Sequence, residues 1–160
     1  MPLSSFSEWH GIYINEIDME KEDIIKNILS VCNDMGVSFH KKVKTDKWKA
    51  DIVVDYQNYK VAFNVCKNPR NIEETYTTMR KERVCGCWLV LSGMYNRFSL
   101  SKYPCFPVED NSEGVQIHLS QVWEEKKTLL LSDFVSSLIQ GKIRYAETMK
   151  VKYVDVRFYK

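Results

Sequence analysis

The sequence predicts an α/β domain in which helices flank a mixed central β-sheet. Two short segments rich in β-branched residues, ADIVVDY at 50–56 and KVAFNVC at 60–66, are separated only by a tight turn and therefore predict a hairpin. A helical pattern follows, and then the continuous apolar run CWLVL at 87–91, which is typical of a strand buried on both faces. A hairpin followed by a helix and a buried strand predicts a mixed sheet with helices packed against it.

A helix and a strand are predicted before this hairpin. Apolar residues recur at helical spacing between 24 and 35, which indicates an amphipathic helix. Asp18 is the expected N-cap of this helix, and Gly36 is expected to end it because glycine favours the left-handed conformation found there. Residues 37–44 then predict a strand.

The helix after the hairpin is predicted from its start signal. Asn71 is followed three residues later by Glu74, which is the pattern of a capping box and predicts a helix over about 72–83. Arg80 and Arg83 lie near the end of this helix. They are candidates for contacts with phosphate groups, although such arginines also pair with acids on the helix surface.

The segment over 92–127 has little periodicity and contains Pro104 and Pro107. Proline lacks a backbone donor and is rare inside a sheet, so the segment predicts loops, apart from one strand near 115–119.

The C-terminal part of the chain predicts one more helix and one more strand. The helix begins at Ser132 and stops at Gly141, and residues 151–159 alternate like a strand. The chain of 160 residues fits a single domain over 1–160. Its expected core is about 18–145, and the strand over about 151–159 follows that core.

Composition narrows the expected location of the protein. No apolar run approaches the roughly 18 residues that a membrane span needs, so no membrane partner is expected. The N-terminus lacks a basic start followed by an apolar core, so it does not have the pattern of a secretory signal. The five cysteines form an odd set, which favours reduced thiols and a cytoplasmic location.

The net charge of the chain says little about binding partners, but one local cluster of charge is informative. The chain has 23 basic and 21 acidic residues, and a net charge of +2 is too small to imply nucleic-acid binding. The segment over 40–49 is different, because it carries five lysines against one acid. These lysines are Lys41, Lys42, Lys44, Lys47 and Lys49. The segment predicts either a solvated hairpin or an edge that contacts phosphates.

The hairpin places three side chains where they would meet. Asp51 stands at the start of its strand, and Asn64 and Cys66 stand two residues apart on the next strand. Because side chains alternate along a strand, Asn64 and Cys66 share one face. The order of helix, three strands, helix and strand resembles the core of the PD-(D/E)XK nucleases. That resemblance implies metal-dependent hydrolysis of phosphodiesters.

The match extends to short motifs along the chain. The residues that carry it are Lys49-Ala50-Asp51, Ala62-Phe63, Ile72-Glu73-Glu74-Thr75, Arg80, Arg83 and Gly86-Cys87-Trp88-Leu89. With these motifs the chain resembles the competence-protein CoiA-like family, over about 37–92 and loosely over 128–145. The resemblance implies a restriction-endonuclease-like fold. It also implies that Asp51, with the positions of Asn64 and Cys66, corresponds to the catalytic and metal-binding set of the family.

Two of these three positions depart from the family pattern. Asn64 stands where the family has glutamate, and Cys66 stands where it has glutamine. Asp51 is then the one anionic metal ligand, which predicts weak binding of Mg²⁺ or Mn²⁺ at best, because these ions need several hard oxygen ligands. A neutral thiol neither binds such an ion well nor orients water well. We therefore expect no cofactor and no catalysis.

Three functions remain open from the sequence. The first is a non-catalytic module that binds DNA or RNA, or a nucleic-acid-processing partner, in a cleft edged by the lysines. The second is an active Mg²⁺- or Mn²⁺-dependent nuclease with a rearranged site. The residues that would supply the rearranged site are Glu20, Asp55, Lys67, Glu73 and Glu74. The third is a protein–protein interaction subunit of a DNA-processing or defence complex.

Overall fold

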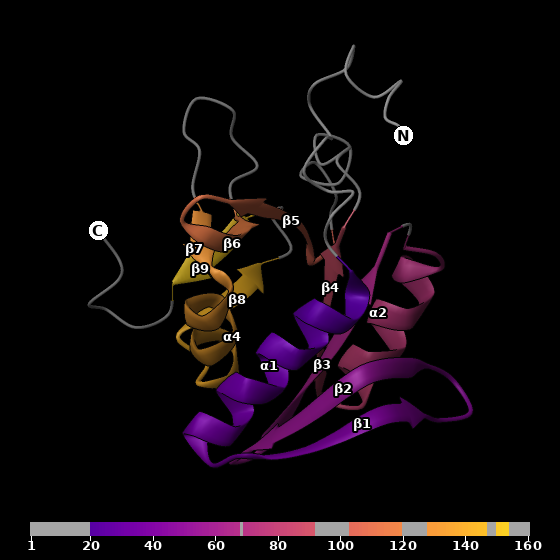
Figure 1. Cartoon of the computed structure of the whole chain (residues 1–160). Helices are drawn as coiled ribbons and strands as arrows, with labels where there is room; N and C mark the ends of the chain where they lie inside the picture. The colour runs from indigo at the N-terminus through magenta and orange to yellow at the C-terminus, as the bar shows by residue number, and fades with distance from the viewer. Residues whose placement is uncertain (1–19, 68, 92–102, 120–127, 147–149, 154–160) are drawn as a thin grey trace.

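The computed structural model describes residues 20–67, 69–91, 103–119, 128–146 and 150–153 (Figure 1). In the first half of the chain the elements are α1 (Lys21–Met35), β1 (Ser38–Lys44), β2 (Lys49–Tyr56), β3 (Tyr59–Cys66), α2 (Ile72–Lys81) and β4 (Val84–Val90). In the second half they are β5 (Cys105–Asn111), β6 (Gly114–His118), β7 (Thr128–Leu130), α4 (Leu131–Ile139), β8 (Ile143–Ala146) and β9 (Lys150–Tyr153).

The central sheet is mixed, as the sequence predicts. Its seven strands are arranged in the order β1-β2-β3-β4-β5-β6-β7, so each strand pairs with its neighbours in the chain. β3, β4 and β5 run parallel to one another, and every other pair in this sheet is antiparallel. α2 connects the parallel strands β3 and β4. β8 and β9 form a separate two-stranded sheet.

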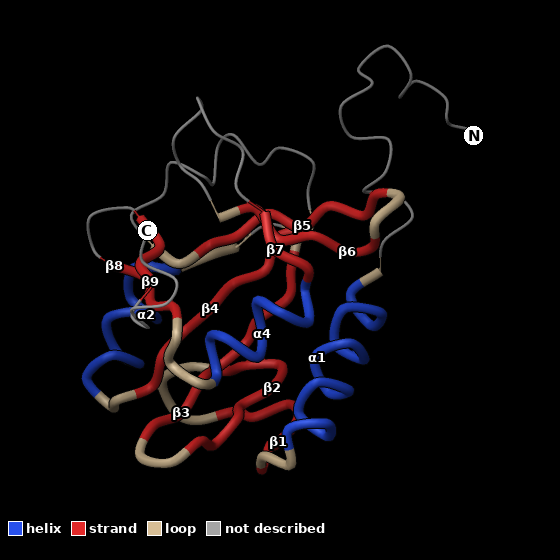
Figure 2. Tube along the Cα trace, turned by 90° about the vertical axis from the view of Figure 1, so that its left-hand side faces the viewer, coloured by secondary structure: helices blue, strands red, loops and turns tan. Residues whose placement is uncertain are grey.

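Helices cover both faces of the sheet. α1 and α4 lie on one face and α2 lies on the other (Figures 1 and 2). The larger apolar cluster lies under α1 and α4, where Phe134 packs against Phe106 with ring centroids 5.1 Å apart. The smaller cluster lies under α2 and includes Met79, Trp88 and Val90. Burial on both faces explains why β4 reads as a continuous apolar run.

One predicted helix end is confirmed by the structure, and one predicted helix cap is wrong. Gly36 ends α1 with φ of 70°, the left-handed conformation expected of it. The capping box at Asn71 and Glu74 is wrong, because Asn71 is itself left-handed, with φ of 53°, and its side chain makes no capping hydrogen bond. An N-cap residue needs extended backbone to aim its side chain at the first turn. Asp18 lies outside the described residues.

The segment predicted to be mostly loop contains a strand that the sequence did not reveal, β5, and a second unpredicted strand, β7, follows the segment directly. The backbone N–H of Trp88 donates to the carbonyl of Pro104. Since backbone groups alternate along a strand, residue 106 also faces β4, and Pro107 faces away from it. Pairing with β6 begins only at Val108. Pro107 therefore sits where its missing N–H interrupts no bond to β4.

The remaining predicted elements are close to their observed bounds. The strand predicted near 115–119 is β6, and the helix predicted from Ser132 is α4, which begins one residue earlier, at Leu131. β9 covers the start of the predicted C-terminal strand, and residues 154–159 lie outside the described part of the chain. Within the described ranges, no helix combines the length and the apolar character needed to cross a membrane.

Candidate functional site

The end of the β2–β3 hairpin opens because the two strands stop pairing there. Their ladder extends only as far as Ile52 of β2. Beyond it, Asp51 Oδ2 accepts a hydrogen bond from the backbone N–H of Val65, over 2.8 Å. Asn64 Nδ2 donates to the backbone carbonyl of Lys49, over 3.3 Å. Side chains thus replace the backbone ladder at the positions that the sequence singled out.

The strand alternation of β2 is interrupted at Asp51. Ile52 and Val54 pack in the cluster under α1 and α4, and Val53 packs in the cluster under α2. Regular alternation would place Ala50 with Ile52, but Ala50 packs with Val53 instead. Asp51 therefore lies at a local irregularity of the strand. This position explains how its carboxylate reaches the backbone of the neighbouring strand.

Both oxygens of the Asp51 carboxylate are engaged. Oδ2 accepts the Val65 N–H, and Oδ1 lies 3.0 Å from Lys21 Nζ. Lys21 is the first residue of α1, and its side chain is 47% exposed, whereas that of Asp51 is 20% exposed. A lysine ammonium group therefore neutralises the carboxylate that the family resemblance would assign to a metal ion.

The Cys66 thiol is protonated at neutral pH. Burial, with a smaller contribution from the nearby Asp51 carboxylate, raises the pKa of Cys66 to about 11, and Lys21 opposes this shift. The thiolate is the reactive form of cysteine, so a thiol with such a pKa is a poor nucleophile near pH 7. Cys66 is thus a half-buried polar side chain of the cleft and not an activated group.

Alkylation of Cys66 by iodoacetamide is expected to be slow at pH 8, where about one thiol in a thousand is ionised at a pKa of about 11. Asp51→Asn should lower the pKa of Cys66 and speed alkylation severalfold, whereas Lys21→Met should raise the pKa and slow it. Mass spectrometry of the Cys66 peptide across a pH series measures both rates, with Cys66→Ser to identify the peptide. Two variants that change the rate in the same direction would contradict this electrostatic account.

These side chains line one cleft of about 740 Å³. Its walls come from α1, the β1–β2 turn region, the ends of β2 and β3, and the start of α2. The charged residues among its described lining are Lys21, Lys42, Lys44, Lys49, Asp51 and Arg70. Five basic side chains therefore surround a single carboxylate, which is itself paired with Lys21.

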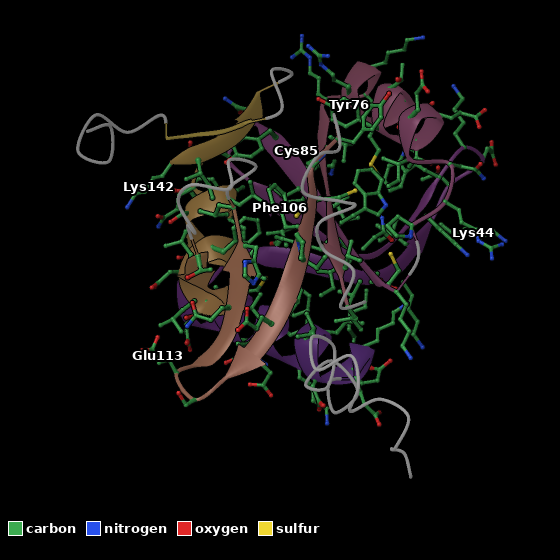
Figure 3. All side chains as sticks on the ribbon, turned by 90° about the horizontal axis from the view of Figure 1, so that it is seen from above. Lys44, Tyr76, Cys85, Phe106, Glu113 and Lys142 are labelled. Carbon is green, nitrogen blue, oxygen red and sulfur yellow. The ribbon has the colours of Figure 1, made fainter. Side chains whose placement is uncertain are left out.

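The turn between β1 and β2, which lies between Lys44 and Lys49, is held by hydrogen bonds within the turn and by one hydrogen bond to the end of α2. The Thr45 hydroxyl accepts hydrogen bonds from the backbone N–H groups of Lys47 and Trp48, at 3.1 and 3.0 Å. Trp48 Nε1 donates to Glu82 Oε1 just after α2, over 2.9 Å. The Trp48 ring is only 9% exposed and packs in the smaller cluster. These contacts fix the strand ends from which Lys44 and Lys49 project (Figure 3 labels Lys44 at the outer edge of the molecule).

The structure brings together some of the predicted basic residues and not others. Lys42, Lys44 and Lys49 line the cleft, whereas Lys41 and Lys47 are not among its lining. Lys42 reaches it with a left-handed backbone, at φ of 51°, which departs from regular strand geometry. Lys42 and Lys44 stand two residues apart, which is the spacing at which side chains share one face of a strand.

Sequence reasoning missed Lys21 and Arg70, which both line the cleft. Arg70 follows β3 within the break before α2, and a break directly after Cys66 must lie at the same end of the sheet. That signal was present in the sequence. Lys21 had no such local signal, because only the packing of α1 across the sheet brings its ammonium group to Asp51.

Arg80 and Arg83, predicted with the lysines as nucleic-acid contacts, line a different cavity. α2 lies along β4, so its start borders the cleft through Thr75 while its end lies toward Val84, where β4 begins. The two arginines are therefore not part of the basic cleft.

The donor set of the cleft does not fit Mg²⁺ or Mn²⁺. Asp51 is paired with Lys21, Asn64 can offer only a neutral amide oxygen, and Cys66 is a protonated thiol. Across the described residues, no group of three or more His, Cys, Asp and Glu side chains is placed to hold a metal ion. The acids and the lysine considered for a rearranged site, Glu20, Asp55, Lys67, Glu73 and Glu74, are absent from the described lining of the cleft. Asp55 instead pairs with Lys60, at 2.6 Å.

Comparison of the chain with protein-family models, curated proteins and solved structures found no match.

Proposed function

We propose that this chain is a nuclease-fold module without metal-dependent catalysis, which binds the phosphate backbone of a nucleic acid in the basic cleft. The observation that carries the proposal is the environment of Asp51. Its carboxylate is paired with Lys21 at 3.0 Å, and four further basic side chains line the same cleft. A cleft with one neutralised carboxylate and a surplus of cations attracts a polyanion and not a divalent cation.

The topology supports the nuclease-fold part of the proposal. α1 precedes three antiparallel strands, and α2 then leads to β4, which is parallel to β3. This is the order of elements that the resemblance to the PD-(D/E)XK nucleases implies. Asp51, Asn64 and Cys66 line one cleft at the end of the central hairpin. We interpret this cleft as a former active site whose metal ligands have been replaced.

The shape of the cleft favours contacts with the backbone over contacts with bases. Trp48 and Trp88 line it, but they are only 9% and 4% exposed. Bases stack on aromatic side chains whose faces are open, so neither ring offers a stacking surface. Lysines act as point charges, and Arg70 adds a planar fork suited to phosphate oxygens. We therefore expect binding that depends little on base sequence and strongly on salt.

Lys49→Ala and Arg70→Ala are each expected to weaken nucleic-acid binding and to flatten its salt dependence. For duplex DNA the slope of log K against log salt changes by about 0.9 for each phosphate contact that is lost. Fluorescence anisotropy over a salt series, with single- and double-stranded DNA and RNA, measures both quantities. Lys81→Ala is the matched control, because it removes the same charge from an exposed position at the end of α2, outside the cleft.

Two results would overturn the proposal in different ways. No binding of any of these nucleic acids at low salt would favour a protein–protein interaction subunit of a DNA-processing or defence complex. Cleavage that requires Mg²⁺ or Mn²⁺ and disappears in Asp51→Ala would show an active nuclease.

A further inference from the structure

A second cavity of about 370 Å³ lies at the opposite end of α2 from the basic cleft. Its apolar lining includes Val84, Pro104, Leu138 and Ile143, and its cationic lining is Arg80 and Arg83. Tyr76 and Cys85 also border it, and Figure 3 shows them apart from Lys44 of the cleft. No acidic side chain is among its described lining.

The wall of this cavity is fixed by contacts between β3 and the end of α4. The Tyr59 hydroxyl donates to the backbone carbonyl of Ile139 and lies 3.3 Å from that of Leu138. Gly141 passes the same ring with φ of 74°, and a Cβ on it would lie 3.1 Å from the Tyr59 hydroxyl oxygen. The glycine thus allows the turn after α4 to close against Tyr59. The cavity is therefore largely preformed, as small-molecule sites usually are.

Arg83 stands at a position that favours glycine. It follows the end of α2 with φ of 64°, and its backbone N–H donates to the carbonyl of Arg80 over 3.1 Å. The left-handed residue after a helix is most often glycine, because a side chain is strained there. Strained residues concentrate at functional sites, so an arginine at this position, bordering a cavity, points to a role for its charge.

The other groups at the mouth suit an anion with an apolar body. Burial raises the pKa of Tyr76, so its phenol stays neutral and remains a hydrogen-bond donor at neutral pH. The volume lies near the lower end of the range for small-molecule sites, about 300–1,000 Å³, which fits a small organic molecule.

We propose that this cavity binds a small organic anion, with its apolar body against the partly exposed side chains of Tyr59, Tyr76 and Cys85 and its single anionic head group at Arg80 and Arg83. Fatty acids and aromatic acids share this chemistry. The site lies apart from the basic cleft, and it does not depend on the proposed binding of nucleic acid.

Glycine amide signals in a ¹H–¹⁵N spectrum of the full chain test the proposal directly. Titration with decanoate should shift the signals of Gly86 and Gly141, which line the cavity, and leave Gly36 and Gly114 in place. Decan-1-ol, which has the same apolar body without the charge, should bind more weakly. Titration with naphthalene-2-sulfonate tests an aromatic anion in the same way. The anion with the lower dissociation constant shows whether the cavity prefers an aliphatic or an aromatic ligand.

Arg83→Gly separates the role of the charge from that of the fold, because glycine suits the left-handed backbone at this position. We expect it to weaken decanoate binding about tenfold, the loss typical of a charged hydrogen bond, and to remove the preference for decanoate over decan-1-ol. Arg70→Ala, in the basic cleft, should leave decanoate binding unchanged. The proposal is wrong if Gly86 and Gly141 do not respond to either anion, if decan-1-ol binds as tightly as decanoate, or if Arg83→Gly has no effect.

Discussion

Asp51→Ala is expected to destabilise the fold and, at the same time, to strengthen nucleic-acid binding. The change removes the acceptor of the Val65 N–H and leaves the Lys21 ammonium group without its partner. An unsatisfied buried polar group costs about 1–3 kcal/mol, and the partial exposure of Asp51 places the effect toward the lower end. Urea unfolding followed by tryptophan fluorescence measures the change in the free energy of unfolding.

The same change makes the cleft more attractive to phosphates. It removes the one carboxylate among five basic side chains. Affinity should rise about tenfold at low salt, and the gain should shrink as salt screens the charges. A loss of stability that accompanies a gain of binding is a result that general damage to the fold would not produce.

Two further variants complete this experiment. Asp51→Asn keeps an oxygen that can accept the Val65 N–H, so it should retain most of the stability while giving the same gain in binding. Asp34→Asn is the charge control, because Asp34 is exposed near the end of α1 and lies outside the cleft. Weaker nucleic-acid binding in Asp51→Asn would show that the carboxylate takes part in binding, and the proposed role of the cleft would be wrong.

The elements predicted correctly are those whose signals are local. Helical spacing and Gly36 define α1, and the short turn after Tyr56 defines the hairpin. β5 was missed because Pro107 is normally excluded from a sheet, and nothing local reveals that its nitrogen faces away from β4. β7 has three residues, too few to show any alternation. In each failure, pairing with the neighbouring strands decided the structure, and no local sequence pattern showed that pairing.

In the candidate site, too, local sequence patterns placed some residues and could not place others. The positions of Asn64 and Cys66 follow from the period of one strand, and Asp51 reaches them through an irregularity in the next strand. Lys21 could not be assigned, because its pairing with Asp51 depends on how α1 crosses the sheet. Arg83 borders a different cavity from the cleft lysines, and the sequence could not show this, because it gives the charge of a residue near a helix end but not which end of the sheet that residue borders.

The pairing of Lys21 with Asp51 also decides how metal binding would be restored. Asn64→Glu combined with Cys66→Gln or Cys66→Lys would supply a second carboxylate and a polar partner for water, as the family pattern implies. Lys21 would still hold the Asp51 carboxylate at 3.0 Å, so this double variant should gain little. Adding Lys21→Ser releases the carboxylate. Removing one cation about 4 Å from a divalent ion should strengthen Mn²⁺ binding about tenfold to a hundredfold over the double variant.

Calorimetry with Mn²⁺ and cleavage of single- and double-stranded substrates with Mg²⁺ or Mn²⁺ test this expectation. The wild type should neither bind Mn²⁺ measurably nor cut. The triple variant should bind Mn²⁺ and cut slowly, because a metal ion turns bound water into a usable nucleophile while the surrounding side chains are not arranged for the reaction. Asp51→Ala in the triple background is the blank. A folded triple variant that does not bind Mn²⁺ would count against reading Asn64 and Cys66 as replaced metal-site positions. The resemblance to the nucleases would then lose its main support.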